Sequence, residues 1–218
     1  MNIPFTSNEF FDVFRSYNEA IWPAQIVLNL IAFGAVLLAF RPQRNDRLIS
    51  SGLALLWLWT GAVYHLFFFT SINPAAYVFG GACIVQSALF LWRGVVKNRL
   101  TYTPVSNPAG WLGGLFVFYG LIGYPVLGYF LGHSYPQSPT FGAPCPTTIF
   151  TFGMLLWTGR SLPLYVLIIP AVWSLVGVTA AFKFGVMEDF GLLVAGITAT
   201  ALITVHKRAS NGKAVPSA

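Results

Sequence analysis

The sequence predicts an all-α polytopic membrane protein with seven transmembrane helices. Three observations predict it: a very apolar composition, seven apolar runs, and basic residues that gather in alternate loops. Hydrophobic residues make up 56% of the 218 residues and charged residues only 8%. Because soluble domains carry about 25% charged residues, a soluble fold is close to excluded.

Apolar runs of about 17 to 25 residues mark helices that can cross a hydrocarbon core of about 30 Å. The expected spans are residues 22–40, 48–70, 74–92, 110–132, 146–159, 162–182 and 187–205. The fifth run is noticeably short, and a re-entrant fifth run would leave six spans. That alternative would move Lys207 and Arg208 to the outside, so seven spans are favoured.

Basic residues predict the orientation of this bundle of residues 22–205. If the amino terminus lies outside, Arg15 and Lys183 are the only lysine or arginine residues on the outer side. The cytoplasmic set is Arg41, Arg44, Arg47, Arg93, Lys97, Arg99, Arg160, Lys207, Arg208 and Lys213. This positive-inside bias places the carboxyl terminus, a basic tail of residues 206–218, in the cytoplasm. The net charge of +6 then indicates anionic lipid headgroups at the cytoplasmic face as partners, and no nucleic acid.

Residues 1–21 precede the first span and predict a short amphipathic helix. Thr6 and Glu9 have the spacing of a capping box. Aromatic side chains then recur at helical spacing, at Phe10, Phe11, Phe14 and Tyr17. We expect this helix to lie on the outer membrane interface. The alternative is a lid folded over the mouth of the bundle.

Side chains capable of chemistry gather at the outer ends of the expected helices. The candidate site residues are Glu19, Tyr64, His65, Cys145, Thr147, Lys183, Glu188 and Asp189. An ionisable residue within a span, such as His65, is a functional hypothesis by default. Glu188 and Asp189 occupy the first turn of the last span, where carboxylates interact favourably with the helix dipole. A site built from these residues is expected to open outward.

Each candidate also has a structural interpretation. His65 can hydrogen-bond to a neighbouring helix, and Lys183 can extend to the interface or pair with the two carboxylates. Thr147 is expected to bond to backbone or to another helix by default. His133, in a polar loop, is expected to be solvated. Cys145 lies between two prolines in GAPCPTTIF, where helix capping competes with chemistry.

Three functions remain open from these residues. The favoured one is a small transporter or binding protein for a soft metal ion or a small solute, since the Cys145 thiolate and the His65 imidazole suit soft cations. The second is an intramembrane enzyme acting on a lipid or small apolar substrate, with Cys145 as nucleophile or His65 as base. The third is a non-catalytic subunit or scaffold.

Several classes are excluded by absent motifs. The last span, FGLLVAGITATALITV, has no lysine, which argues against covalent retinal, and no other cofactor is indicated. No HExxH, GxSxG, P-loop or CxxC pattern occurs. Cys83 and Cys145 are too far apart in sequence and expected depth to suggest a disulfide framework.

Four blocks carry a resemblance: YNEAIWPAQ, YHLFFFTSINPAAYVFG, CPTTIFTFG and EDFGLLVAG. Together they resemble a family of small bacterial multipass membrane proteins classed as a domain of unknown function. The resemblance implies a multipass protein of the bacterial inner (plasma) membrane. It implies no activity, ligand or catalytic residue, and self-association into a homo-oligomer stays open.

Overall fold

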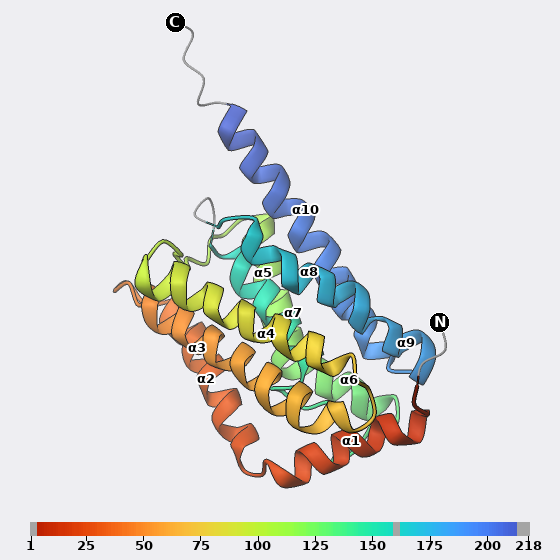
Figure 1. Ribbon diagram of the computed structural model, residues 1–218. Helices are drawn as coiled ribbons and strands as arrows, with labels where there is room; N and C mark the ends of the chain where they lie inside the picture. Colours follow the sequence, from red (N-terminus) through yellow and green to blue (C-terminus); the bar gives the residue numbers. More distant parts are fainter. Residues whose placement is uncertain (1–3, 159–161, 213–218) are drawn as a thin grey trace, which may run out of the picture.

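The computed structural model describes residues 4–158 and 162–212, with side chains as far as residue 207. Within these ranges every regular element is helical and no strand occurs, which confirms the predicted all-α class (Figure 1). Parts of the predicted pattern fall outside the described residues: position 159 of the fifth span, Arg160, the side chain of Arg208, and residues 213–218 of the expected tail, which include Lys213.

The helices follow one another with short connections. The first half contains α1 (Ser7–Ala20), α2 (Ala24–Ala39), α3 (Asp46–Trp59) with the π-helical η1 (Thr60–Phe68) and the 3-10 turn η2 (Phe69–Ser71), and α4 (Ala76–Phe90) with η3 (Leu91–Val96). The second half contains α5 (Pro108–Phe118), η4 (Tyr119–Gly123), α6 (Tyr124–Phe130), α7 (Pro144–Leu156), α8 (Tyr165–Gly177), α9 (Thr179–Phe184), η6 (Met187–Asp189) and α10 (Phe190–Gly212).

Five helical segments of the described chain are long and apolar enough to cross a membrane. They are Asp46–Ser71, Ala76–Val96, Pro108–Phe130, Tyr165–Phe184 and Met187–Lys207. A sixth results only if α1 and α2, which meet at an angle of 87°, are counted as one broken span. The other two predicted spans correspond to α2, with 16 residues, and α7, with 13, and neither reaches spanning length alone.

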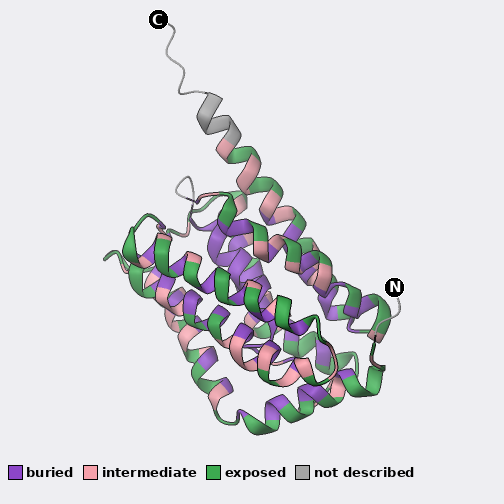
Figure 2. Ribbon diagram, in the orientation of Figure 1, coloured by how far each residue is buried: buried purple, intermediate pink, exposed green. Residues whose placement is uncertain are grey.

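Helix α7 is short because it lies inside the protein. All of its side chains except that of Cys145 are buried, as the purple centre of Figure 2 shows. Gly113 of α5 and Gly153 of α7 let these two helices pack closely against each other. A Cβ on Gly153 would lie only 2.6 Å from the Gly113 carbonyl oxygen. Pro144 suits the first turn of α7, where no amide hydrogen is needed. A helix whose ends meet protein has no need to match the bilayer thickness.

Helix α1 folds over one end of the bundle, and we call residues 7–20 the α1 lid (Figure 1). The predicted capping box is present: the Glu9 carboxylate accepts from the Thr6 amide at 2.7 Å, and the Thr6 hydroxyl accepts from the Glu9 amide at 3.3 Å. The apolar face of the lid packs on protein, with Phe10, Phe14 and Tyr17 all buried. The lid alternative therefore describes this helix better than an apolar face immersed in lipid.

Charge is sorted between the two ends of the bundle. At the basic end, α2, α4, α7 and α10 finish and α3, α5 and α8 begin; the opposite end, under the α1 lid, is the cavity end. The described basic side chains of the basic end are Arg41, Arg44, Arg47, Arg93, Lys97, Arg99 and Lys207. Lys207 donates to the Leu162 carbonyl at 3.1 Å, next to the connection between α7 and α8.

Candidate functional site

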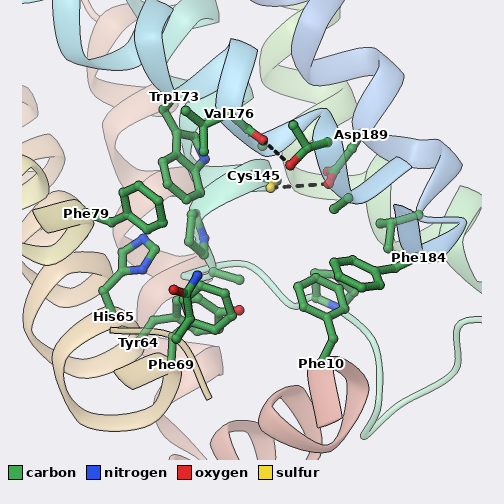
Figure 3. Close-up of a pocket in the computed structure, with 18 of the residues that line it drawn as sticks. Phe10, Tyr64, His65, Phe69, Phe79, Cys145, Trp173, Val176, Phe184 and Asp189 are labelled. Carbon is green, nitrogen blue, oxygen red and sulfur yellow. Dashed lines mark hydrogen bonds between the residues drawn. The ribbon is translucent and has the colours of Figure 1, made fainter. Parts of the chain in front are cut away.

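A cavity of about 620 Å³ lies beneath the α1 lid at the cavity end (Figure 3). Its wall combines residues of the lid, η1, α4, the start of α7, α8, α9 and η6. Aromatic rings dominate the wall: Phe5, Phe10, Phe14, Tyr64, Phe69, Phe79, Trp173 and Phe184. The remaining lining is mainly aliphatic, so the few polar groups stand out against an apolar surface.

Five of the eight predicted site residues line this one cavity. They are Tyr64, His65, Cys145, Lys183 and Asp189. Glu19, Thr147 and Glu188 do not line it. Five of the candidates thus lie together at one cavity, whereas their outward orientation and their function stay predictions.

Asp189 is brought inward by the turn between α9 and α10. Gly185 adopts a left-handed conformation, with φ of 76°, and ends α9, after which η6 carries Asp189 into the interior. The carboxylate is 1% exposed. One oxygen accepts from the Tyr124 hydroxyl at 2.6 Å, and the other accepts from the Cys145 thiol at 3.5 Å.

No basic side chain pairs with Asp189 among the described residues. Lys183, which lines the same cavity, is exposed at its rim and forms no ion pair with Asp189 or Glu188 there. Of the two structural alternatives for Lys183, the pairing with the two carboxylates is therefore not seen. Asp189 is held by two neutral donors only.

His65 lies on the opposite side of the cavity, in the π-helical segment η1. Its side chain is fully buried, with the ring centroid 5.0 Å from that of Trp173 and 5.7 Å from that of Phe79. Neither ring nitrogen has a hydrogen-bond partner among the described groups, so the bond to a neighbouring helix, the structural alternative for His65, is not seen there. Buried polar atoms are nearly always paired, and π-helical segments are frequent at functional sites.

Trp173 links the two polar regions of the cavity. A Cβ built on Gly177 would lie 3.4 Å from both the Trp173 Nε1 and the Cys145 Sγ, so both atoms lie beside that glycine. The polar groups thus form a strip from His65 past Trp173 to Cys145 and Asp189, as Figure 3 shows. The Phe10 and Phe184 rings, stacked with centroids 4.5 Å apart, lie elsewhere in the wall.

Glu188 turns away from the cavity and contacts His133. The two side chains are joined by a 3.0 Å contact between Nδ1 and Oε1, and Glu188 is fully buried. The side chain of His133 is only 15% exposed, and Phe11 of the lid stacks on it at 5.1 Å. His133 is therefore not the solvated loop residue that the sequence suggested, because the loop folds against η6 and the lid.

Thr147 and Glu19 have no position in the cavity wall. The Thr147 hydroxyl accepts from the Gly142 amide at 3.2 Å, and its carbonyl accepts from the Thr151 hydroxyl at 2.8 Å. Thr147 thus has the structural role that was its default. Glu19 is exposed on the lid.

A metal centre is not supported by this arrangement. The described residues contain no group of three or more His, Cys, Asp or Glu side chains placed to hold a metal ion. The Cys145 thiol contacts Asp189, and the His65 ring is surrounded by aromatic rings, so a soft-metal site on Cys145 and His65 stays a prediction. Cys83 lies buried in α4, and both cysteines are free.

Three residues of the site were not anticipated from the sequence: Tyr124, Phe79 and Trp173. The sequence offers one weak signal, since Trp173 lies well inside an expected span rather than at a membrane interface, where tryptophan is enriched. Tyr124 and Phe79 look like ordinary packing residues in sequence. Only the fold brings them to Asp189 and His65.

Over the residues that the structure describes, the fold and the cavity define an all-helical bundle with five apolar segments of membrane-spanning length and a cavity lined by aromatic rings. The chain belongs to the family of unknown function DUF6064, whose profile matches residues 7–214. The resemblance to an uncharacterised family is thereby confirmed. No curated protein matches the chain, and neither does any solved structure.

Proposed function

We propose that this protein is an integral membrane protein that binds a small, largely apolar molecule in the cavity beneath the α1 lid, as a binding protein or small transporter. The cavity itself carries the proposal. Its volume of about 620 Å³ falls within the range of about 300 to 1,000 Å³ of small-molecule sites. Like those sites, it joins an apolar wall to a few converging polar groups.

Membrane insertion is supported by the outward faces of the helices. On α2 alone, Leu30, Phe33 and Leu37 are each at least 50% exposed. We propose seven traverses of a bacterial inner membrane, with the short, buried α7 as one of them. The basic end then faces the cytoplasm and its anionic headgroups, and the cavity end faces outward.

The rim of the cavity suggests how a ligand enters. Val172 and Leu175 of α8 line the cavity and are 54% and 60% exposed. An apolar ligand dissolved in the bilayer would therefore reach the cavity laterally, past these two side chains of α8. The buried, unpartnered His65 favours a binding role over a pure scaffold, in which such a group would only destabilise the fold.

Protection of Cys145 from alkylation tests this proposal. The Cys83→Ala variant retains Cys145 as its single cysteine, and occupancy of the cavity should slow its modification by N-ethylmaleimide. The probes are 2-phenylethanol, 2-phenylethylamine and 3-phenylpropanoate, applied to protein in lipid nanodiscs. We expect at least one of them to slow modification in a saturable manner.

A filled cavity provides the matched control. Ala180 lines the cavity, and Ala180→Phe should remove the protection because the added ring takes the place of the probe. Ala88 is exposed on α4, and Ala88→Phe should leave the protection intact. Absence of saturable protection by all three probes, or equal protection in the Ala180→Phe variant, would contradict ligand binding in this cavity.

A further inference from the structure

We infer that the ligand is an organic cation, a protonated amine carried on an apolar body, with Asp189 as its counter-charge. This inference rests on the proposed function and adds the chemical class of the ligand. Three independent features of the cavity support it: an unpaired carboxylate, an unpartnered imidazole and a wall of aromatic rings.

The carboxylate of Asp189 has capacity for another partner. It is 1% exposed and accepts from the Tyr124 hydroxyl and the Cys145 thiol, both of them neutral donors. A carboxylate offers about four lone-pair sites, so these two bonds leave room for more. A buried charge without an opposite charge is unfavourable, and buried carboxylates are usually paired. A protonated amine in the cavity supplies the missing positive charge.

The imidazole of His65 is the second feature. It is fully buried, lines the same cavity, and has both ring nitrogens unpartnered among the described groups. A neutral imidazole carries one acceptor nitrogen, which can take an N–H bond from an amine. A carboxylic acid anion would satisfy the His65 N–H as well, but Asp189 would repel it within the same cavity.

Aromatic faces are the third feature. Trp173, Tyr64 and Phe79 lie between or beside the two polar groups, and five further phenylalanine rings complete the wall. A cation over the face of such a ring is attracted by the negative face of its π-system, with tryptophan the strongest partner. The same rings hold the apolar body of the ligand. The Asp189 carboxylate and the aromatic rings therefore both favour a positively charged ligand.

Lys183 is the one lysine or arginine among the described residues that line the cavity. It is exposed, so solvent and salt screen its charge, whereas Asp189 is buried. Its repulsion of a cation is therefore weaker than the attraction by Asp189. An anionic ligand would bind only if its attraction to Lys183 at the rim were stronger than its repulsion by Asp189 in the interior.

Matched probes separate the ligand classes. In the Cys83→Ala background at neutral pH, 2-phenylethylamine is cationic, 2-phenylethanol is its neutral counterpart and 3-phenylpropanoate is anionic. We expect the dissociation constant of the amine, measured by protection of Cys145, to be at least 10-fold lower than that of the alcohol. Asp189→Asn should bring the two constants within about 2-fold, because the amide still accepts from Tyr124 but carries no charge.

The neighbouring Glu188 supplies the control. Glu188 is equally buried but contacts His133 outside the cavity, so Glu188→Gln should keep the amine preference. Equal binding of the amine and the alcohol in the parent, tighter binding of 3-phenylpropanoate, or an amine preference that survives Asp189→Asn would overturn the inference while leaving the proposed function in place. The comparison of probes in the parent decides the matter even if the Asp189→Asn variant fails to fold. Loss of protection by every probe would instead remove the proposed function.

Discussion

The two ends of the bundle treat a buried carboxylate in opposite ways. At the basic end, Asp46 accepts from the Tyr102 amide at 2.8 Å and pairs with Arg44 at 3.1 Å. At the cavity end, the partners of Asp189 among the described residues are a hydroxyl and a thiol. The protein supplies a basic partner for the carboxylate of Asp46, but among the described residues it supplies none for that of Asp189. This difference separates a structural acid from one that is available to a ligand.

The surroundings of the two ends differ in the same sense. Charged groups of the basic end reach solvent, as Arg44 does with a 69% exposed side chain, or lie over rings, as Lys97 lies 4.6 Å from the Trp92 centroid. The cavity end buries His65, Glu188 and Asp189 to 1% exposure or less. Buried ionisable groups thus concentrate where the cavity lies. Substitutions at both ends can test whether this contrast is functional.

Removing the bonds that hold the lid should have the strongest consequence. Asn18 is fully buried, donates to the Pro136 and Ser138 carbonyls at 2.7 and 2.8 Å, and accepts from the Thr140 hydroxyl at 2.6 Å. At about 1 kcal/mol for each bond, Asn18→Ala should destabilise the protein by about 3 kcal/mol. It should also speed the alkylation of Cys145 by loosening the lid. Thermal unfolding and the rate of N-ethylmaleimide modification measure the two effects.

Asn29 offers a control for this change. Its side chain bonds within its own helix, from Nδ2 to the Gln25 carbonyl at 2.8 Å, and not to the loop that Asn18 binds. Asn29→Ala should therefore leave the alkylation rate of Cys145 near that of the parent. An Asn18→Ala variant with unchanged stability and unchanged alkylation would show that α1 is not held as a lid by this residue.

An intermediate effect is expected at the basic end. Asp46→Ala should destabilise the protein by about 1 to 3 kcal/mol, because the buried Tyr102 amide loses its acceptor. Asp46→Asn keeps an acceptor oxygen and should recover most of this loss, since an ion pair whose cation is exposed, as Arg44 is, contributes only about 0 to 1 kcal/mol. Chemical unfolding of both variants measures the difference. Equal destabilisation by the two substitutions would assign the stabilisation to charge instead.

A weaker effect concerns pH and the start of the lid. Hydrogen bonds from the Thr6 backbone and hydroxyl lower the pKa of Glu9 from its ordinary value of 4.5. A folded-state pKa below the unfolded value means that the stabilisation is complete above about pH 4.5 and is lost as the pH falls through the folded pKa. Hydrogen exchange in residues 7–20 should therefore show less protection in acid than at neutral pH.

Glu9→Gln isolates the carboxylate in that experiment. The amide of the variant does not titrate, so the acid-dependent part of the loss of protection in residues 7–20 should disappear, after correction for the intrinsic exchange rate. If the parent and the variant show the same acid dependence, another group controls the start of the lid.

Local features of this protein were predictable because they depend on neighbours in sequence. The capping box of Thr6 and Glu9 spans only three residues, and it forms as expected. The helical class follows from long apolar runs, and the sorting of basic residues follows from the order of the loops. The count of seven spans was less secure, since the lengths of α2 and α7 fall below what a lone span needs.

The amino-acid sequence alone was enough to establish an all-helical, apolar chain of a family of unknown function, with basic residues at one end and candidate polar residues at the other. The packing of the folded chain was needed to show that α1 covers the bundle, that Glu188 contacts His133 across 55 residues, and that His65 and Asp189 share one cavity. The reason is physical. Helices form from local hydrogen bonds and apolar content, whereas the neighbours of a buried polar side chain depend on how distant helices pack.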